Sequence, residues 1–192
     1  NCDWSSDVCS SDLHPHPGRR RLGPGTQMSA PQALVVMGVS GAGKTTLGQS
    51  LAERLGWPFF EGDDFHPPAN LAKMAEGQPL DDADRAPWLA RLNQLLQDQL
   101  SEDTSLVLAC SALKAEYRAQ LRAGVESQVR FIYLKGDYAL IHQRMQGRVG
   151  HFMSPEMLES QFSALEVPDD ALVVDVVQPV PGIVASLIAR LL

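Results

Sequence analysis

The feature that most constrains the fold is a glycine-rich octapeptide that ends in lysine and threonine. It reads Gly38-Val39-Ser40-Gly41-Ala42-Gly43-Lys44-Thr45 and matches the pattern G-x-x-x-x-G-K-[ST]. A short apolar run, residues 33–39, leads into it, and residues 44–55 follow with leucines at helical spacing. A strand, a glycine-rich turn and a helix in this order form a phosphate-binding loop, so we predict one here.

Each residue type of this loop has a physical role. Glycines adopt backbone conformations that a side chain would penalise, so the loop can wrap closely around phosphate oxygens. Lys44 is expected to reach the β- and γ-phosphates, and the Thr45 hydroxyl is expected to bind Mg²⁺, with Thr46 on the helix outside the metal shell. No Asn-Lys-x-Asp segment of the kind that reads guanine is present, which disfavours a GTPase. The motif therefore predicts that ATP and Mg²⁺ bind at the loop and the first turn of the helix. The residues of this predicted site are Gly38, Ser40, Gly41, Ala42, Gly43, Lys44, Thr45 and Thr46.

Strand and helix patterns alternate along the rest of the chain. Its 192 residues suit one domain with a full core, and 44% hydrophobic with 20% charged residues is ordinary for a globular protein. Alternation of this kind indicates βαβ units, so we predict an α/β, P-loop NTPase-type three-layer fold with a five-stranded parallel sheet and helices on both faces. The predicted strands are 33–39, 57–61, 105–110, 129–134 and 172–177, and the predicted helices are 44–55, 69–75, 88–100, 114–123, 138–146, 155–165 and 183–192.

Charge and cysteine content narrow the classes of partner. A net charge of −7 argues against nucleic acid and anionic membranes as partners, because the surface as a whole would repel both. No apolar run reaches the ~18 residues of a membrane span. The three cysteines show no spacing typical of a disulfide framework or a metal cluster, so Cys110 is expected to be a small buried residue and the compartment the cytoplasm.

Residues 1–27 differ from the rest of the chain. Ser, Asp, His, Pro, Gly and Arg dominate there without sustained periodicity, and the ordered regions of a signal peptide are missing. We expect this stretch to be a non-native or disordered tail, with Met28 as the natural start and the P-loop domain extending over residues 28–192.

An acidic turn follows the second predicted strand. Residues 61–67 read Glu-Gly-Asp-Asp-Phe-His-Pro. Paired acids at this point could hold Mg²⁺ through water, accept the proton of an attacking hydroxyl or bind substrate hydroxyls. A solvated acidic turn is the plainer interpretation. The position of the turn, at the carboxyl end of a strand beside the phosphate loop, favours a functional role for its acids.

Two further cations have two open interpretations each. Arg85 could pair with Asp82 or Asp84, or it could clamp the carboxylate of an acceptor with two hydrogen bonds. The same two aspartates could cap the helix predicted at 88–100. Lys114 is either a solvated helix residue or a contact to a substrate carboxylate. Trp88 is expected in the core rather than at the substrate. The helix after Lys114 carries three residues that could equally lie on the surface or at an interface: Tyr117, Arg118 and Arg122.

Bases and glycines concentrate in residues 144–152, between two predicted helices. Phosphoryl transfer spreads negative charge over the moving group, and positioned arginines stabilise that charge. Glycines would let such a segment close over the site and exclude water. We therefore predict a mobile lid with Arg144 and Arg148 as charge clamps, while His151 could contact a ligand or make a structural hydrogen bond.

Taken together, these segments resemble the gluconate kinase (gluconokinase) family over nearly all of residues 30–190. The matching strings are Met37-Gly38-Val39-Ser40-Gly41-Ala42-Gly43-Lys44-Thr45, Gly62-Asp63-Asp64-Phe65-His66-Pro67, Lys73-Met74, Gly77-Gln78-Pro79-Leu80, Asp84-Arg85, Cys110-Ser111-Ala112-Leu113-Lys114, Tyr117-Arg118, Tyr133-Leu134-Lys135-Gly136-Asp137, Gly150-His151-Phe152, Gln161-Phe162, Leu165-Glu166 and Val174-Asp175 with Pro179.

The resemblance implies an activity, a site and an assembly. The activity is transfer of the ATP γ-phosphoryl group to the 6-hydroxyl of D-gluconate, giving 6-phosphogluconate and ADP. Asp63 would lie near the acceptor hydroxyl and the metal, and the segment near Gln178 would lie by the adenine. A mobile lid and a homodimer are also implied. The acceptor-side residues it suggests are Asp63, His66, Arg85 and Lys114, and the catalytic residues are Lys44, Asp63, Arg144 and Arg148.

Two alternatives differ in class. A kinase for another hydroxy acid, such as shikimate, or for a nucleotide would share the loop and the lid but differ around Asp63, Arg85 and Cys110. An ATP-binding module without catalysis would keep nucleotide binding but turn over no acceptor. Intact Lys44, Thr45 and Asp63, together with the lid arginines, argue against that second alternative.

The loop assignment makes a direct prediction. Replacement of the Lys44 ammonium in the variant Lys44→Ala removes the cation expected at the β- and γ-phosphates, so turnover of gluconate should be abolished. A coupled assay of ADP release measures it. Phosphorylation of gluconate at the wild-type rate by this variant would refute the assignment.

Overall fold

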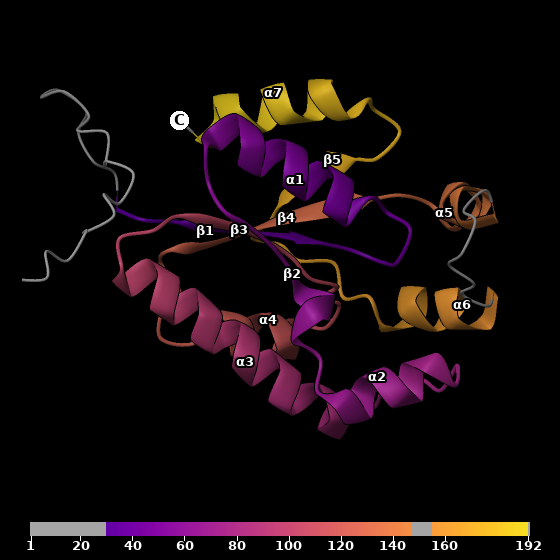
Figure 1. Cartoon of the computed structure of the whole chain (residues 1–192). Coiled ribbons are helices and arrows are strands. Elements are labelled where there is room, and N and C mark those ends of the chain that lie inside the picture. The colour runs from indigo at the N-terminus through magenta and orange to yellow at the C-terminus, as the bar shows by residue number, and fades with distance from the viewer. Residues whose placement is uncertain (1–29, 147–154, 192) are drawn as a thin grey trace, which may run out of the picture.

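The computed structural model describes residues 30–146 and 155–191. Its centre is a parallel sheet in the order β2-β3-β1-β4-β5 (Figure 1). The prediction of five parallel strands is therefore confirmed, with ends that move by one or two residues. The strands are β1 Ala33–Met37, β2 Phe59–Glu61, β3 Leu106–Ala109, β4 Val129–Lys135 and β5 Leu172–Asp175.

Helices cover both faces of this sheet and so form the predicted three layers. Helices α1 and α7 pack together on one face, and α3 and α4 pack together on the other (Figure 1). The helices are α1 Lys44–Leu55, the 3-10 helix η1 Gly62–Phe65, α2 Pro68–Ala75, α3 Asp82–Ser101, α4 Ala115–Arg122, α5 Tyr138–Gln146, α6 Pro155–Ala164 and α7 Val180–Leu191.

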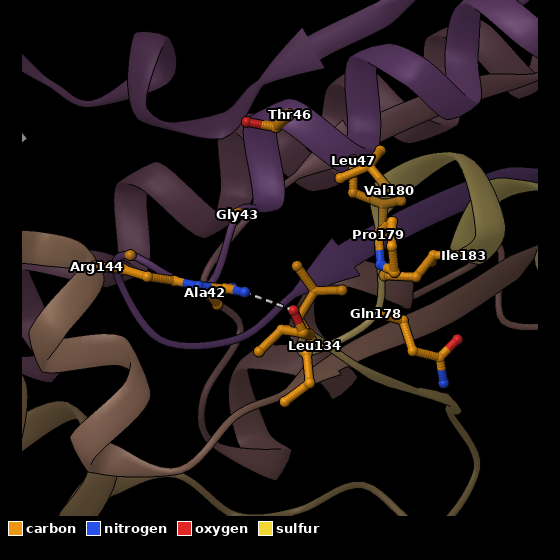
Figure 2. A pocket seen from close by; sticks show the side chains of 13 residues that line it. Ala42, Gly43, Thr46, Leu47, Leu134, Arg144, Gln178, Pro179, Val180 and Ile183 are labelled. Atoms are coloured by element: carbon orange, nitrogen blue, oxygen red, sulfur yellow. Dashed lines mark hydrogen bonds between the residues drawn. The ribbon is translucent and has the colours of Figure 1, made fainter.

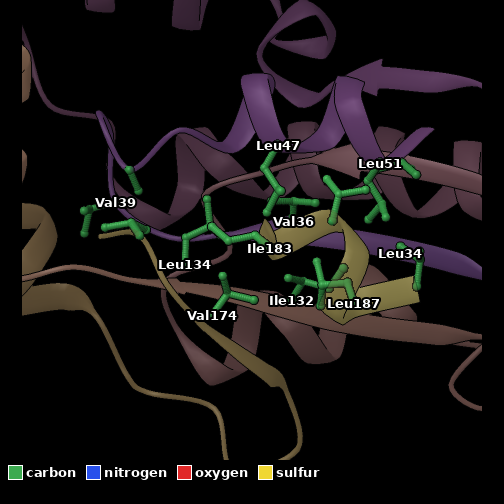
Figure 3. Packing of buried hydrophobic residues seen from close by; sticks show 14 of the residues in the cluster. Leu34, Val36, Val39, Leu47, Leu51, Ile132, Leu134, Val174, Ile183 and Leu187 are labelled. Carbon is green, nitrogen blue, oxygen red and sulfur yellow. The ribbon is translucent and has the colours of Figure 1, made fainter. Parts of the chain in front are cut away.

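The two faces of β1 supply two separate cores. Its even-numbered side chains, Leu34 and Val36, join a cluster with α1 and α7 that Figure 3 shows from close by. Its odd-numbered side chains, Ala33, Val35 and Met37, join a second cluster with α3 and α4. Alternation of side chains along a strand explains this division, and a strand buried on both faces reads as a continuous apolar run.

The order of the strands determines where a ligand can bind. From β1 the chain goes to β2 on one side, and from β3 it crosses β1 to reach β4 on the other side. The carboxyl ends of β1 and β3 therefore border a crevice at which the connections diverge, the usual ligand position in such sheets. The loops after these two strands touch there, because the Gly38 amide donates a hydrogen bond of 3.2 Å to the Ser111 carbonyl.

The starts of two helices correct the prediction, since α7 begins at Val180 rather than at Ile183. Helix α3 begins at Asp82 rather than at Trp88, and Pro87 lies inside it. Its N-cap is Asp81, neither Asp82 nor Asp84 as predicted, and a capping box joins Asp81 to Asp84 in both directions. A reciprocal pair of this kind satisfies two amides that the first turn leaves open, which offsets the amide lost at the internal proline.

Helix α4 also differs from the expectation of a surface or interface helix. Tyr117 and Arg118 are buried, and Arg118 Nη1 donates hydrogen bonds to the carbonyls of Ala112 and Leu113. Only Arg122 lies near the surface, where it forms an ion pair of 2.6 Å with Asp170. The prediction that Cys110 is a small buried residue is confirmed. Burial raises the pKa of its thiol to about 12.

The close approach of η1 to β3 yields a stability prediction. A Cβ at Gly62 would lie 2.5 Å from the carbonyl oxygen of Ala109, which is backbone and has no room to shift. We expect Gly62→Ala to lower the free energy of unfolding by about 1–3 kcal/mol. Urea denaturation monitored by circular dichroism measures this change.

A matched glycine serves as the control. Gly182 lies in α7 with open space around its Cβ position, so Gly182→Ala should raise stability by about 0.5–1 kcal/mol through helix propensity. Equal shifts of the urea midpoint in the two variants would contradict the packing argument.

Candidate functional site

The predicted phosphate loop lies between β1 and α1, as the sequence indicated. Three of its glycines have positive φ: Gly38 at 143°, Gly41 at 81° and Gly43 at 98°. Gly43 is the N-cap of α1 and offers no side-chain acceptor to the first turn. Gly43 gives this helix end no side-chain cap, so its amides and the helix dipole together favour an anion such as a phosphate group.

The two residues that end the motif contact different partners. Lys44 Nζ donates a hydrogen bond of 3.0 Å to the Val39 carbonyl, which holds the ammonium over the loop. Thr45 Oγ1 donates one of 2.7 Å to Glu61 Oε2 at the end of β2. Burial raises the pKa of Glu61, although the hydrogen bond from Thr45 lowers it.

The pair Thr45 and Glu61 fits a Mg²⁺ site in which most of the ligands come from water and the substrate phosphates. Within residues 30–146 and 155–191, no group of three or more His, Cys, Asp or Glu side chains could hold a metal by itself. Mg²⁺ keeps several waters and takes one or two protein oxygens beside substrate phosphates, and the Thr45 hydroxyl with a nearby carboxylate supplies that donor set. The carboxylate at hydrogen-bond distance is that of Glu61, whereas the metal role predicted for Asp63 stays a prediction.

A first cavity of about 480 Å³ opens beside the loop (Figure 2). Loop residues 41–43 form one wall, and the segment from Val176 to Ile183, after β5, forms the other. Arg144 of α5 reaches across it, and its Nη2 donates a hydrogen bond of 2.7 Å to the Val176 carbonyl. The apolar wall and the neighbouring loop amides suit a flat ring joined to phosphates.

A second cavity of about 430 Å³ lies on the other side of the loop. Lys44, Asp63, His66 and Arg85 all line it, although they come from different elements of the chain. Helix α6 closes one side, where Gln161 Oε1 accepts a hydrogen bond of 2.7 Å from the Ser40 amide. This second cavity, which we call the acceptor pocket, brings together four of the predicted catalytic and acceptor-side residues.

Arg85 is the cation that the acceptor pocket leaves available. The acids around it are already engaged: Asp84 binds Lys73 Nζ at 2.6 Å, and Asp82 binds Lys114 Nζ at 2.7 Å and accepts from the Tyr117 hydroxyl. Arg85 itself has no ion-pair partner among the residues that the structure describes. Its guanidinium carbon lies 5.7 Å from the centroid of the Tyr117 ring.

Lys114 lies apart from the acceptor pocket. Its ammonium forms two hydrogen bonds to the Asp82 carboxylate, and this interaction raises the pKa of Lys114 and lowers that of Asp82. The sequence left two roles open for Lys114, a solvated residue or a contact to a substrate carboxylate. In the structure Lys114 instead pairs with Asp82 of α3 and does not line the pocket. A role for Lys114 in substrate binding stays a prediction.

Trp88 confirms the expectation of a core residue and also forms the floor of the acceptor pocket. It is 2% exposed, and its Nε1–H donates a hydrogen bond of 2.7 Å to the Gly62 carbonyl. Its ring stacks on that of His66, with centroids 4.3 Å apart. Helix α3 therefore holds the acidic turn in place.

Two predicted residues fall outside the residues that the structure describes. Arg148 and His151 belong to residues 147–154, as does most of the predicted lid. Arg144 is described, and it lies in the last turn of α5 at the first cavity. Its role as a charge clamp remains a prediction.

Sequence reasoning missed three polar residues of the site. The sequence pattern presents Glu61 only as part of an acidic turn, although its place at the end of β2 is a signal that it faces the crevice. Gln161 and Asn70 lack such a signal, because each reaches the site from a helix whose packing the sequence does not specify. Gln161 contacts the loop, and Asn70 contacts His66.

The comparisons with known proteins agree with this geometry. A family described as an AAA domain matches residues 34–168. The chain is 53% identical over 146 residues to a gluconokinase of Gluconobacter oxydans (strain 621H), covering 76% of this chain and 82% of that protein. It is 45% identical over 158 residues to the thermoresistant gluconokinase of Escherichia coli (strain K12), covering 80% and 90%.

Solved structures show the same likeness. A gluconokinase from Sinorhizobium meliloti 1021 superposes with a TM-score of 0.75 at 43% identity, covering 84% of this chain and 94% of that one. An APS kinase from Mycobacterium tuberculosis, at 19% identity and a TM-score of 0.63, shares the fold alone. Within the described residues, no helix is both long and apolar enough to cross a membrane. By the extent and identity of these matches, the chain belongs to the gluconokinase family of P-loop kinases.

Proposed function

We propose that this protein is a gluconokinase, an ATP-dependent phosphotransferase that phosphorylates the 6-hydroxyl of D-gluconate. The observation that carries the proposal is the acceptor pocket, in which Lys44 and Asp63 lie with Arg85, a cation that no acid among the described residues pairs with. The first cavity would take the adenosine, the loop the phosphates and the acceptor pocket the sugar acid. Relatives named gluconokinase, at 45% and 53% identity, support the choice of acceptor.

The chain's own groups divide the work. The loop amides and Lys44 bind and neutralise the phosphates, and Arg144, with Arg148, would stabilise charge on the moving phosphoryl group. Mg²⁺, held at Thr45 and a nearby carboxylate, would supply charge neutralisation and orientation of the phosphates. Asp63 would orient the acceptor hydroxyl or take its proton, and His66 would contact the acceptor beside Asp63.

Gluconate is an anion, which makes the acceptor pocket's cation the key to its recognition. Arg85 is the candidate, because a guanidinium can bind a carboxylate through two parallel hydrogen bonds. The neighbouring acids are held by Lys73 and Lys114, so they do not neutralise Arg85 by pairing with it. The ion pairs around Arg85 thus preserve a positive charge at the pocket of an acidic protein.

The activity is tested by a coupled assay of ADP release with purified protein and Mg·ATP. D-gluconate, shikimate and nucleoside monophosphates are offered side by side. Turnover of gluconate well above the others supports the proposal. Turnover of shikimate or a nucleotide instead would move the protein to another acceptor, and nucleotide binding without any turnover would indicate a module without catalysis.

We also infer a homodimer and a cytoplasmic enzyme, from the resemblance to the family and from the sparse cysteines. Light scattering coupled to size-exclusion chromatography measures the first. A mass near twice the 20.9 kDa of the chain supports it, and a single-chain mass overturns it.

The role of Arg85 yields a prediction that uses two substrates. Arg85→Gln should lower kcat/KM for gluconate about 10- to 100-fold, mainly through KM, because a charge-assisted hydrogen bond of about 1.5–3 kcal/mol is lost. Glucitol carries an alcohol in place of the carboxylate, so its weaker turnover should change little. Arg130→Gln, at an exposed strand position, is the matched control. An equal loss with both substrates would count against a carboxylate contact.

The contact between Thr45 and Glu61 yields a prediction about the metal. Glu61→Gln keeps the shape of the side chain but removes its charge, so the Mg²⁺ concentration for half-maximal rate should rise about 10-fold or more. Titration of Mg²⁺ at fixed ATP measures it, with the exposed Glu53→Gln on α1 as the control. An unchanged requirement for Mg²⁺ in Glu61→Gln would argue that Asp63 is the carboxylate that matters.

A further inference from the structure

A buried asparagine on α2 determines which hydrogen-bonding role His66 can have. Asn70 is 3% exposed, and its Nδ2 donates a hydrogen bond of 2.8 Å to the carbonyl oxygen of Asp84. A carbonyl oxygen only accepts, so this contact assigns the amide nitrogen, not the amide oxygen, to that side. The same Nδ2 lies 3.3 Å from Nδ1 of His66. The second hydrogen of the amide therefore points at the imidazole.

The position of the imidazole proton follows from this contact. Since Asn70 donates to Nδ1, Nδ1 must be the bare, accepting nitrogen, and the proton of the neutral ring sits on Nε2. Burial and the charge of Arg85 lower the pKa of His66, against an opposing effect of Asp63, which favours the neutral ring. Stacking on Trp88, with ring planes 13° apart, fixes the orientation of the ring.

The Nε2 edge of His66 faces the acceptor pocket. Nε2 lies 3.9 Å from Oδ1 of Asp63, whose side chain is 75% exposed, and both residues line that pocket. A nitrogen that already carries a proton has no lone pair with which to take another. Of the two side chains, only the Asp63 carboxylate offers free lone pairs toward an incoming hydroxyl.

We propose that Asn70 is a positioning residue that locks His66 as the Nε2–H tautomer, so that His66 donates a hydrogen bond in the acceptor pocket and Asp63 receives the proton of the acceptor hydroxyl. The inference rests on the proposed function and names the proton acceptor within it. In the transfer, the O–H bond of the acceptor breaks and its proton passes to the Asp63 carboxylate. The freed oxygen bonds to the γ-phosphorus as the bond from that phosphorus to the β–γ bridging oxygen breaks, and ADP leaves.

The tautomer can be observed directly by NMR. Long-range ¹H–¹⁵N correlation on the uniformly ¹⁵N-labelled full chain reports which ring nitrogen of each histidine carries a proton. The chain has five histidines, so the signal that disappears in His66→Gln assigns His66. We expect a protonated Nε2 and a bare Nδ1 for His66 at neutral pH. A bare Nε2, or a doubly protonated ring, would overturn the proposal.

A variant of Asn70 tests the cause of the tautomer. Asn70→Leu keeps the approximate volume but removes both donors, so the His66 signal should shift toward a mixture of tautomers. Retention of a pure Nε2–H ring in a folded Asn70→Leu protein would show that Asn70 does not set it. If Asn70→Leu does not fold, the wild-type spectrum still tests whether His66 is the Nε2–H tautomer.

Kinetics separate a donor from a proton acceptor at position 66. Glutamine places an amide nitrogen near the position of Nε2 but cannot accept a proton, whereas leucine offers neither. We expect His66→Leu to lose about 10- to 100-fold in kcat and His66→Gln to lose clearly less. Asp63→Asn should lose about 10²- to 10⁴-fold, as expected for a general base. His142→Gln on α5 is the control.

The outcomes distinguish this inference from the proposed function. If His66→Gln falls as far as His66→Leu while Asp63→Asn stays active, His66 is the proton acceptor and the inference is wrong, although the protein is still a gluconokinase. If the wild-type protein turns over no gluconate, the proposed function falls. The NMR measurement then still decides whether Asn70 and His66 have the assigned tautomer.

Discussion

Strand β1 is buried on both of its faces, and this burial holds the phosphate loop where it is. All five residues of β1 are fully buried, and burial of each larger apolar side chain contributes about 1.5–3 kcal/mol. The strand is also hydrogen-bonded on both edges, to β3 and to β4. Gly38 then leaves the sheet with a positive φ and bonds to Ser111. A loop anchored in this way can keep its amides directed at a ligand without a side-chain cap.

Local pairing of charges explains how an acidic protein presents cations to anionic substrates. The chain carries a net charge of −7, and three aspartates lie at or near the start of α3 beside Arg85. Asp81 caps that helix in a reciprocal pair with Asp84, Lys73 binds Asp84, and Lys114 binds Asp82. These partly exposed pairs contribute little stability, because solvent screens them. Their effect lies in position, since they leave Arg85 as a cation at the acceptor pocket.

The sequence predicted features that depend on local patterns and missed those that depend on packing between distant segments. The apolar runs indicated all five strands, and the loop motif placed α1 to the residue. Pro87 interrupts the helical pattern, so the sequence predicted a start at Trp88. The structure starts α3 at Asp82, where Asp81 and Asp84 form a capping box. The bond from Lys114 to Asp82 joins α4 to α3, and the bond from Thr45 to Glu61 joins α1 to β2. Neither contact could be read from spacing along the chain, because both depend on how the helices and strands pack.

The two sides of the site are built on different foundations. The nucleotide side rests on the sheet itself, since the loop after β1, helix α1, Leu134 of β4 and the segment after β5 form its walls. Much of the acceptor side rests on residues 61–88, which leave the sheet after β2 and are held together by Trp88 against Gly62 and by Asn70 against Asp84. Substitutions within this segment can reshape the acceptor pocket while β1 and its loop stay in place. A chain organised in this way can keep its phosphoryl donor and change its acceptor, because the contacts that select each of them lie on opposite sides of the same loop.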